Sequence, residues 1–148
     1  GLVALPQSPV AGLALRSWRR DPVMAFLPAD WRCPARITPA WLAKQPLILN
    51  DATTRLSRLI SEWFALGGYR PVPRIELNFN DAIKSLVAAG YGAALLPHEA
   101  GAPQSNARIV MRSLRPALSR ELGIAHRAGP IERATQHVLD ALWELKAR

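Results

Sequence analysis

One stretch, residues 78–101, limits what this chain can fold into more than any other part of the sequence. Its first half has apolar side chains at helical spacing, which predicts a helix with one face in the core. These side chains are Ala82, Ile83, Leu86 and Val87. Gly90 then stands where a helix ends in a left-handed turn. The apolar run 93–96, which Pro97 ends, does not alternate with polar residues and therefore predicts a short strand covered on both faces.

The start of this predicted helix is rich in short polar side chains. Asn78 or Asn80 can cap it, because a side-chain oxygen accepts a backbone N–H that has no partner in the first turn. Asp81 suits the positive end of the helix dipole.

The rest of the chain alternates between strand and helix patterns. We predict strands at residues 1–5, 13–18, 22–27, 46–49, 74–77, 109–111 and 122–126, and loops at 28–36 and 101–107. Thr38 and Pro39 begin a short helix, and Gly67 and Gly68 end a longer one that starts near Arg55. We predict that the last helix buries one face, formed by Ile131, Ala134, Val138, Leu142 and Leu145. This alternation predicts an α/β fold with a largely parallel sheet.

Composition narrows the class of protein. The 148 residues fit one domain, and 49% hydrophobic with 20% charged residues excludes wholesale disorder. No apolar run approaches the roughly 20 residues that span a membrane. The apolar N-terminus lacks a basic region and is interrupted by Pro6 and Pro9, so we do not interpret it as a signal peptide. We therefore expect a cytoplasmic protein without a membrane partner.

The formal charge of +8 would suit nucleic acid or an anionic ligand. The basic residues are spread along the chain without interleaved aromatic residues, so we do not predict that this chain binds nucleic acid directly. Cys33 is the only cysteine, which excludes an internal disulfide. It is either a redox-sensitive thiol or a packed side chain, and we favour packing.

Catalytic motifs are missing from the sequence. There is no nucleophile elbow, no P-loop and no H-E-x-x-H, and His98, His126 and His137 lie in separate predicted elements. We therefore expect no enzymatic activity, no catalytic residue, no metal site and no cofactor.

Binding is better supported, because two predicted helices begin with polar clusters directly after strands. The first junction is 49–54 and the second is 77–80. In an α/β sheet such junctions face a common crevice, where unpaired N–H groups favour anions. The polar residues at each junction can be helix caps, ligand contacts, or one of each, and the sequence leaves these alternatives open.

The segment DAIKSLVAAGYGAALLP, residues 81–97, resembles the hallmark of the effector-binding domain of LysR-type transcriptional regulators. The resemblance continues in DPVMAFLPADW at 21–31, in QPLILNDATTRLSRLISEWFALGG at 45–68 and in SRELGIAHRAGP at 119–130. It covers nearly the whole chain. The family's winged helix, linker helix and the opening of its effector domain have no counterpart before Gly1, so we expect this chain to be the later part of that domain.

The resemblance implies a type 2 periplasmic-binding-protein-like sheet with helices on both faces and an incomplete first subdomain. It implies that residues 1–35 belong to the first subdomain and a crossover, 36–110 to the second subdomain, and 111–148 to the return into the first with the C-terminal helix. By position, it implies ligand contacts at Thr53, Thr54, Asn78, Phe79 and Asn80. Arg55 follows the threonines and could assist an anionic effector.

The function implied is the sensing of a small metabolite, which we expect to bear a carboxylate, and its transmission to a DNA-binding domain absent from this chain. DNA would be a partner only through that missing winged-helix domain. The alternative is a periplasmic solute-binding protein of a transporter, which shares the architecture. We also expect homo-oligomeric self-association, because strands 1–5 and 22–27 would lack neighbours in an incomplete subdomain.

Overall fold

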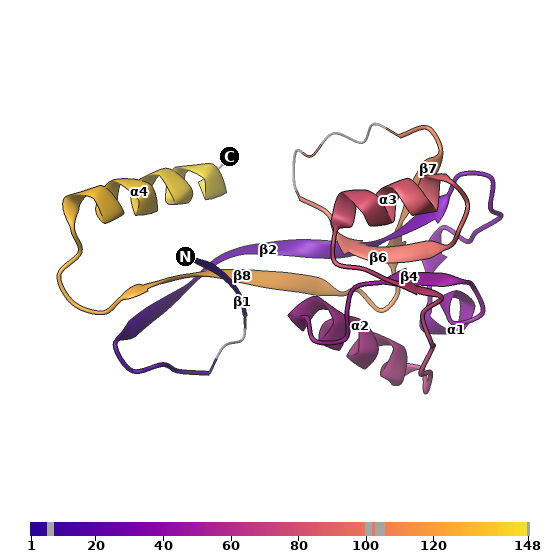
Figure 1. The fold of residues 1–148 in the computed structure, drawn as a ribbon, viewed down its shortest axis with the longest axis horizontal. Coiled ribbons are helices and arrows are strands. Elements are labelled where there is room, and N and C mark those ends of the chain that lie inside the picture. The colour runs from indigo at the N-terminus through magenta and orange to yellow at the C-terminus, as the bar shows by residue number, and fades with distance from the viewer. Residues whose placement is uncertain (6–7, 100–101, 103–105, 148) are drawn as a thin grey trace. The chain divides into compact units, whose positions relative to one another are not determined.

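The computed structural model describes residues 1–5, 8–99, 102 and 106–147. The chain forms two compact units. Unit 1 comprises Gly1–Asp21 and Arg120–Arg148, and unit 2 comprises Pro22–Ser119. Strand β2 (Leu13–Pro28) contributes its first part to unit 1 and its second part to unit 2 (Figure 1).

The sheet of unit 2 has the order β3-β7-β2-β6-β4-β5. Its other strands are β3 (Arg36–Ile37), β4 (Leu47–Leu49), β5 (Ile75–Glu76), β6 (Ala93–Pro97) and β7 (Ile109–Leu114). Strand β4 pairs in parallel with β5 and β6, as predicted, because helices connect these strands. The prediction of a largely parallel sheet is wrong at β2, which is antiparallel to both β6 and β7. Among the described residues, the parallel pairs of this sheet are those of β4 with β5 and β6 and that of β3 with β7.

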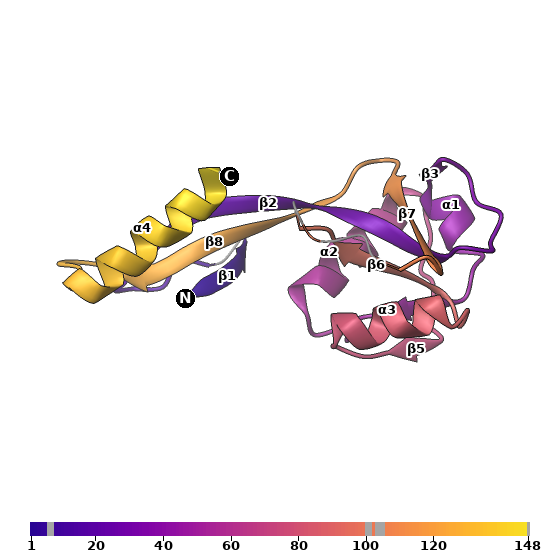
Figure 2. The ribbon, with the colours of Figure 1, turned by 90° about the horizontal axis from the view of Figure 1, so that it is seen from above.

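Helices cover both faces of this sheet. Helices α1 (Pro39–Leu42) and α2 (Arg55–Leu66) pack on one face and α3 (Asn80–Ala88) on the other, as Figures 1 and 2 show. Successive residues of β6 alternate between the two cores: Ala93 and Leu95 join the α1 and α2 side, and Ala94 and Leu96 join the α3 side. This arrangement explains the unbroken apolar run and confirms the prediction that both faces of the strand are covered.

Two glycines shape the turn between α3 and β6. Gly90 has φ of 88°, which confirms the predicted left-handed turn. Gly92 lies against β4: a Cβ at this position would be 2.7 Å from the carbonyl oxygen of Pro46. That oxygen accepts the N–H of Ala93 at 2.9 Å, so a side chain at Gly92 would disturb the start of the pairing between β6 and β4.

The described residues of unit 1 form strands β1 (Leu2–Leu5), β8 (Ser119–Arg127) and the first part of β2, together with helix α4 (Arg133–Ala147). Strand β8 lies between β1 and the first part of β2, and β1 pairs antiparallel with β8. Helix α4 packs through Leu139 against Trp18 and Ile124. The indole Nε1 of Trp18 also donates to the carbonyl oxygen of Leu142 at 2.8 Å.

Three sequence predictions need correction here. The predicted core face of α4 is confirmed at Leu142, which packs against the buried cluster, and wrong at Val138 and Leu145, which are 59% and 60% exposed, whereas Leu139 is buried. Residues 13–18 and 22–27 form one strand, β2, rather than two. Its second part has a strand on each side, so the expectation that 22–27 lacks neighbours is also wrong. The predicted loop 101–107 lies partly outside the described residues.

Candidate functional site

The first junction leads from β4 into α2, and Thr54 is the helix N-cap. Its Oγ1 accepts the backbone N–H of Ser57 at 3.1 Å and donates to the carbonyl oxygen of Asp51 at 2.9 Å. Of the two threonines, Thr54 is therefore the one that caps. A hydroxyl that already donates can offer a ligand only its remaining lone pair, so Thr54 can act toward a ligand as an acceptor only.

Asp51 and Thr53 form a tight turn ahead of this cap. The carboxylate Oδ1 of Asp51 accepts the hydroxyl of Thr53 at 2.7 Å and its backbone N–H at 2.8 Å. These two hydrogen bonds, the hydroxyl first, hold the pKa of Asp51 below its usual value because they favour the charged form. The head of α2 thus carries an ionised carboxylate. Its other oxygen, Oδ2, has no hydrogen-bond partner within the described part of the chain.

Asn78 connects the second junction to the first. Its side-chain Oδ1 accepts the backbone N–H of Asp51 at 2.9 Å, although the two residues are 27 positions apart. The two junctions, residues 49–54 and 77–80, therefore form one continuous surface on unit 2, which we call the polar surface. Because Oδ1 is engaged, the Nδ2 amide of Asn78 is the atom that can donate to a ligand.

The prediction that Asn78 or Asn80 caps α3 is wrong. Phe79 occupies the N-cap position without a side-chain hydrogen bond, and Asn80 is the first helical residue. The reason is the bond described above, which draws the Asn78 side chain toward Asp51. Phe79 is 76% exposed, Asn80 is exposed too, and Asp81 lies in the first turn as predicted.

Two buried polar atoms near this surface have no hydrogen-bond partner among the described residues. One is Oδ1 of Asn50, whose residue is only 7% exposed; its Nδ2 makes a long contact of 3.5 Å to the carbonyl oxygen of Leu77. The other is Nε of Arg55, the first residue of α2. Buried polar groups are nearly always hydrogen-bonded in folded proteins, so each of these atoms can still take a hydrogen-bond partner from outside the described residues.

The surface therefore offers both kinds of hydrogen-bonding group. Its donors include the Asn78 amide and the Arg55 guanidinium, and its acceptors include Oδ2 of Asp51 and the hydroxyl of Thr53. Sequence reasoning selected the two threonines and the residues 78–80 but left out Asp51. The spacing D-x-T, with an acceptor two residues before a threonine N–H, is the signal that could have found it. The burial of Asn50 has no comparable signal.

The remaining candidates of the sequence lie elsewhere. His98 follows β6, His126 is in β8 and His137 is in α4, and the described residues contain no group of three or more His, Cys, Asp or Glu that could hold a metal ion. Cys33 is partly buried and packs against the core of unit 2. None of the helices in the described residues has the length and apolarity that crossing a membrane requires.

The fold is shared with several solved regulators. The structure matches the CcmR regulatory domain of Synechocystis PCC6803 in complex with 2-PG (TM-score 0.80, 18% identity, 98% of this chain and 72% of that one). It also matches the effector-binding domain of QuiR in complex with shikimate (TM-score 0.81, 16% identity, 99% and 71%). Full-length OxyR C199D from Pseudomonas aeruginosa matches with a TM-score of 0.78 and 24% identity over 97% of this chain.

At these identities the structural likeness establishes the fold alone. This chain spans 49% of full-length OxyR, so about half of such a regulator has no equivalent in it. The sequence has no match among curated proteins. The family model for the LysR substrate binding domain matches residues 1–147, nearly the entire chain. This match does not favour the alternative that the chain is the solute-binding protein of a transporter. The chain therefore belongs to the LysR substrate binding domain family.

Proposed function

We propose that the polar surface at the heads of α2 and α3 is the effector-binding site of a transcriptional regulator. The observation that carries this proposal is the bond from Asp51 N–H to Asn78 Oδ1, which joins two strand-to-helix junctions into one surface. The ligand contacts would come from Thr53, Thr54 and residues 78–80, together with Asp51. CcmR and QuiR, which share the fold, are solved with the small molecules 2-PG and shikimate.

The charges around this surface define the class of effector. A carboxylate on the ligand would be attracted by the unpartnered guanidinium of Arg55 and by the positive end of α2. The ionised Asp51 would repel a ligand that offers nothing but a carboxylate. An effector that also carries a hydroxyl or ammonium group would donate to Oδ2 of Asp51 and avoid that repulsion. We therefore propose a small hydroxy- or amino-carboxylate.

Binding would act by shifting a conformational equilibrium. A ligand favours one arrangement of a protein only to the extent that it binds that arrangement more tightly. In the proposed regulator the shift would be transmitted to a DNA-binding domain outside this chain, without enzymatic activity and in the cytoplasm. The assignment of residues 36–110 to the second effector subdomain, with 1–35 and 111–148 in or leading to the first, belongs to the same proposal.

Calorimetric titration of the chain with small hydroxycarboxylates, each paired with its deoxy acid, tests the site. The hydroxy acid should bind more tightly than its deoxy partner. Thr54→Ala and Asn80→Ala should each weaken binding by roughly 1–3 kcal/mol, since each leaves a ligand group without its partner.

Helix capping complicates the Thr54 variant, so it needs a matched control. Thr38→Ala removes the N-cap of α1, where the Thr38 hydroxyl accepts the N–H of Trp41 at 3.3 Å, and should lower stability without changing affinity. Unchanged affinity in both Thr54→Ala and Asn80→Ala, with a lower melting temperature for the former, would reduce these residues to structural roles.

We also propose that the chain self-associates. Helix α4 leaves Val138 and Leu145 largely exposed, and β1 has one strand neighbour, β8, among the described residues. Exposed apolar side chains and strand edges both favour association. Sedimentation over a concentration series should show a rising mass, and a single monomeric species at every concentration would contradict the proposal.

A further inference from the structure

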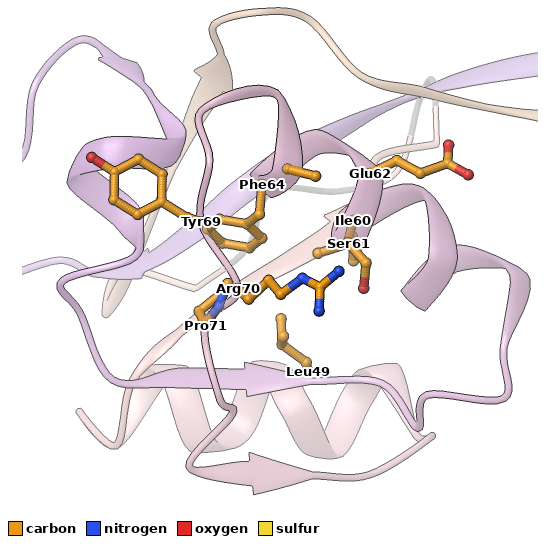
Figure 3. A pocket seen from close by; sticks show the side chains of 9 residues that line it. Leu49, Ile60, Ser61, Glu62, Phe64, Tyr69, Arg70 and Pro71 are labelled. Carbon is orange, nitrogen blue, oxygen red and sulfur yellow. The ribbon is translucent and has the colours of Figure 1, made fainter.

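A pocket lies on unit 2 and, apart from Leu49, is lined by residues outside the two junctions described above. It has a volume of about 500 Å³ and lies between the C-terminal half of α2 and the segment that follows this helix (Figure 3). It is lined by Leu49, Ile60, Ser61, Glu62, Phe64, Ala65, Tyr69, Arg70 and Pro71. This volume is within the range of sites for small molecules, which run from roughly 300 to 1,000 Å³.

The backbone after α2 explains why the pocket exists. Gly68, with φ of 80°, turns the chain, and the N–H of Tyr69 bonds to the carbonyl oxygen of Phe64 at 3.1 Å. The segment next meets the sheet at Arg74, whose N–H bonds to the carbonyl oxygen of Leu47 at 2.8 Å. Between these two anchors Pro71 and Pro73 have no N–H to donate, so the segment does not extend β5.

The segment beside the pocket is held at both ends and is conformationally restricted between them. The rings of Pro71 and Pro73 restrict φ at two of its positions. Ile60 and Phe64, both 1% exposed, belong to the rigid core beneath it. A site that is already formed loses little entropy when a ligand enters.

The accessible walls of the pocket are mainly apolar, and they include one cationic side chain, that of Arg70. Leu49, Ala65 and Pro71 supply accessible hydrocarbon surface above Ile60 and Phe64. Figure 3 shows the Arg70 side chain extending toward Ser61. Glu62 and Tyr69 point away from this part of the pocket. Arg70 has no hydrogen bond or ion pair with any other described residue, so its guanidinium is available to pair with a carboxylate.

We propose that this pocket binds a small amphipathic carboxylate, an aromatic or branched aliphatic acid, with its apolar part against Leu49, Ala65 and Pro71 and its carboxylate on Arg70. The ligand class differs from that of the polar surface, where Asp51 and the amides demand hydroxyl or ammonium groups. The polar surface uses the first turn of α2, with Thr54 at its head, whereas the pocket uses the part of this helix from Ile60 to Ala65.

The test uses 1-naphthoate as the probe and 1-naphthylmethanol as its uncharged counterpart, followed by amide NMR spectra of the chain. The naphthoate should shift the amides of residues 60–65 and of Tyr69 and Arg70 in a saturable way. Arg70→Gln should weaken naphthoate binding about tenfold or more, because a charge-assisted hydrogen bond is lost. It should not change the binding of the alcohol.

Arg74→Gln is the matched control, since Arg74 is an exposed arginine of the same segment that does not line the pocket. It should bind naphthoate as the original chain does. The proposal fails if naphthoate shows no saturable shifts at millimolar concentration, or if its shifts centre on other residues. It also fails if Arg70→Gln weakens the acid and the alcohol equally, or if Arg74→Gln weakens the acid as much as Arg70→Gln does.

Discussion

The two units bury the side chains of their helices to different extents. In unit 2 the sheet is covered on both faces, and large side chains of α2 and α3 such as Trp63, Phe64 and Ile83 are at most 1% exposed. Among the described residues of unit 1 the buried cluster consists of Trp18, Ile124 and Leu139, with Leu122, Leu142 and Trp143 around it. Unit 2 therefore holds its candidate site on a rigid base, whereas unit 1 depends on few buried contacts.

The largest expected difference concerns core truncation. Ile60→Ala in α2 and Leu139→Ala in α4 remove the same number of carbon atoms from side chains that are 1% and 8% exposed. Such changes lower the free energy of unfolding by about 2–5 kcal/mol. We expect a loss near the upper end of this range for Ile60→Ala and near the lower end for Leu139→Ala, because unit 1 can relax around the cavity. Urea denaturation monitored by circular dichroism measures both. Equal losses would mean that the two cores are equally well packed.

Added volume should sharpen the same contrast. Gly92→Ala places a Cβ 2.7 Å from the backbone oxygen of Pro46, inside a sheet covered on both faces. Gly123→Ala in β8 meets the mobile end of the Leu5 side chain at 2.9 Å and the backbone oxygen of Arg16 at 3.0 Å. Overpacking typically lowers the free energy of unfolding by about 1–3 kcal/mol. We therefore expect a loss of about 3 kcal/mol for Gly92→Ala and of about 1 kcal/mol for Gly123→Ala. Melting temperatures of the two variants, measured side by side, decide whether that order holds.

The sequence predicted unit 2 better than unit 1 for a physical reason. Where an element packs fully against a core, the spacing of its apolar residues along the sequence shows which face is buried, as in α2 and β6. Helix α4 instead has an apolar arc that is wider than the surface it packs against, so the periodicity could not reveal which part is buried. Trp18 and Ile124, which lie far away in the sequence, decide that it is Leu139.

The break predicted within β2 failed for a related reason. Charged residues followed by Pro22 look like a turn, yet Asp21 is 2% exposed within the strand. Its carboxylate pairs with Arg19, with 2.9 Å from Nε to Oδ1, and with Arg120, with 3.0 Å from Nη2 to Oδ2. The partner 99 positions away cannot be seen in local sequence, and neither can the bond between Asp51 and Asn78 that unites the candidate site.

The smallest effect that we expect is on the pH dependence of stability. The pKa of Asp51 is lowered in the folded chain, so its ionisation stabilises the fold at pH values above the usual pKa of about 3.8. That contribution falls as pH drops below this value and is lost once pH passes through the lower folded pKa. Asp51→Asn should therefore be less stable than the original chain at about pH 6. The difference should disappear on acidification. A difference that grows as the pH falls would show that Asp51 is not held in its charged form.

The effector site that we propose lies on unit 2, where the heads of α2 and α3 meet. Amide NMR spectra recorded while the tightest-binding hydroxycarboxylate is added test this site directly. We predict saturable shifts at residues 51–56 and 78–80, together with smaller or absent shifts for the deoxy acid. Shifts confined to α4 and β8, or equal binding of the deoxy acid, would contradict it.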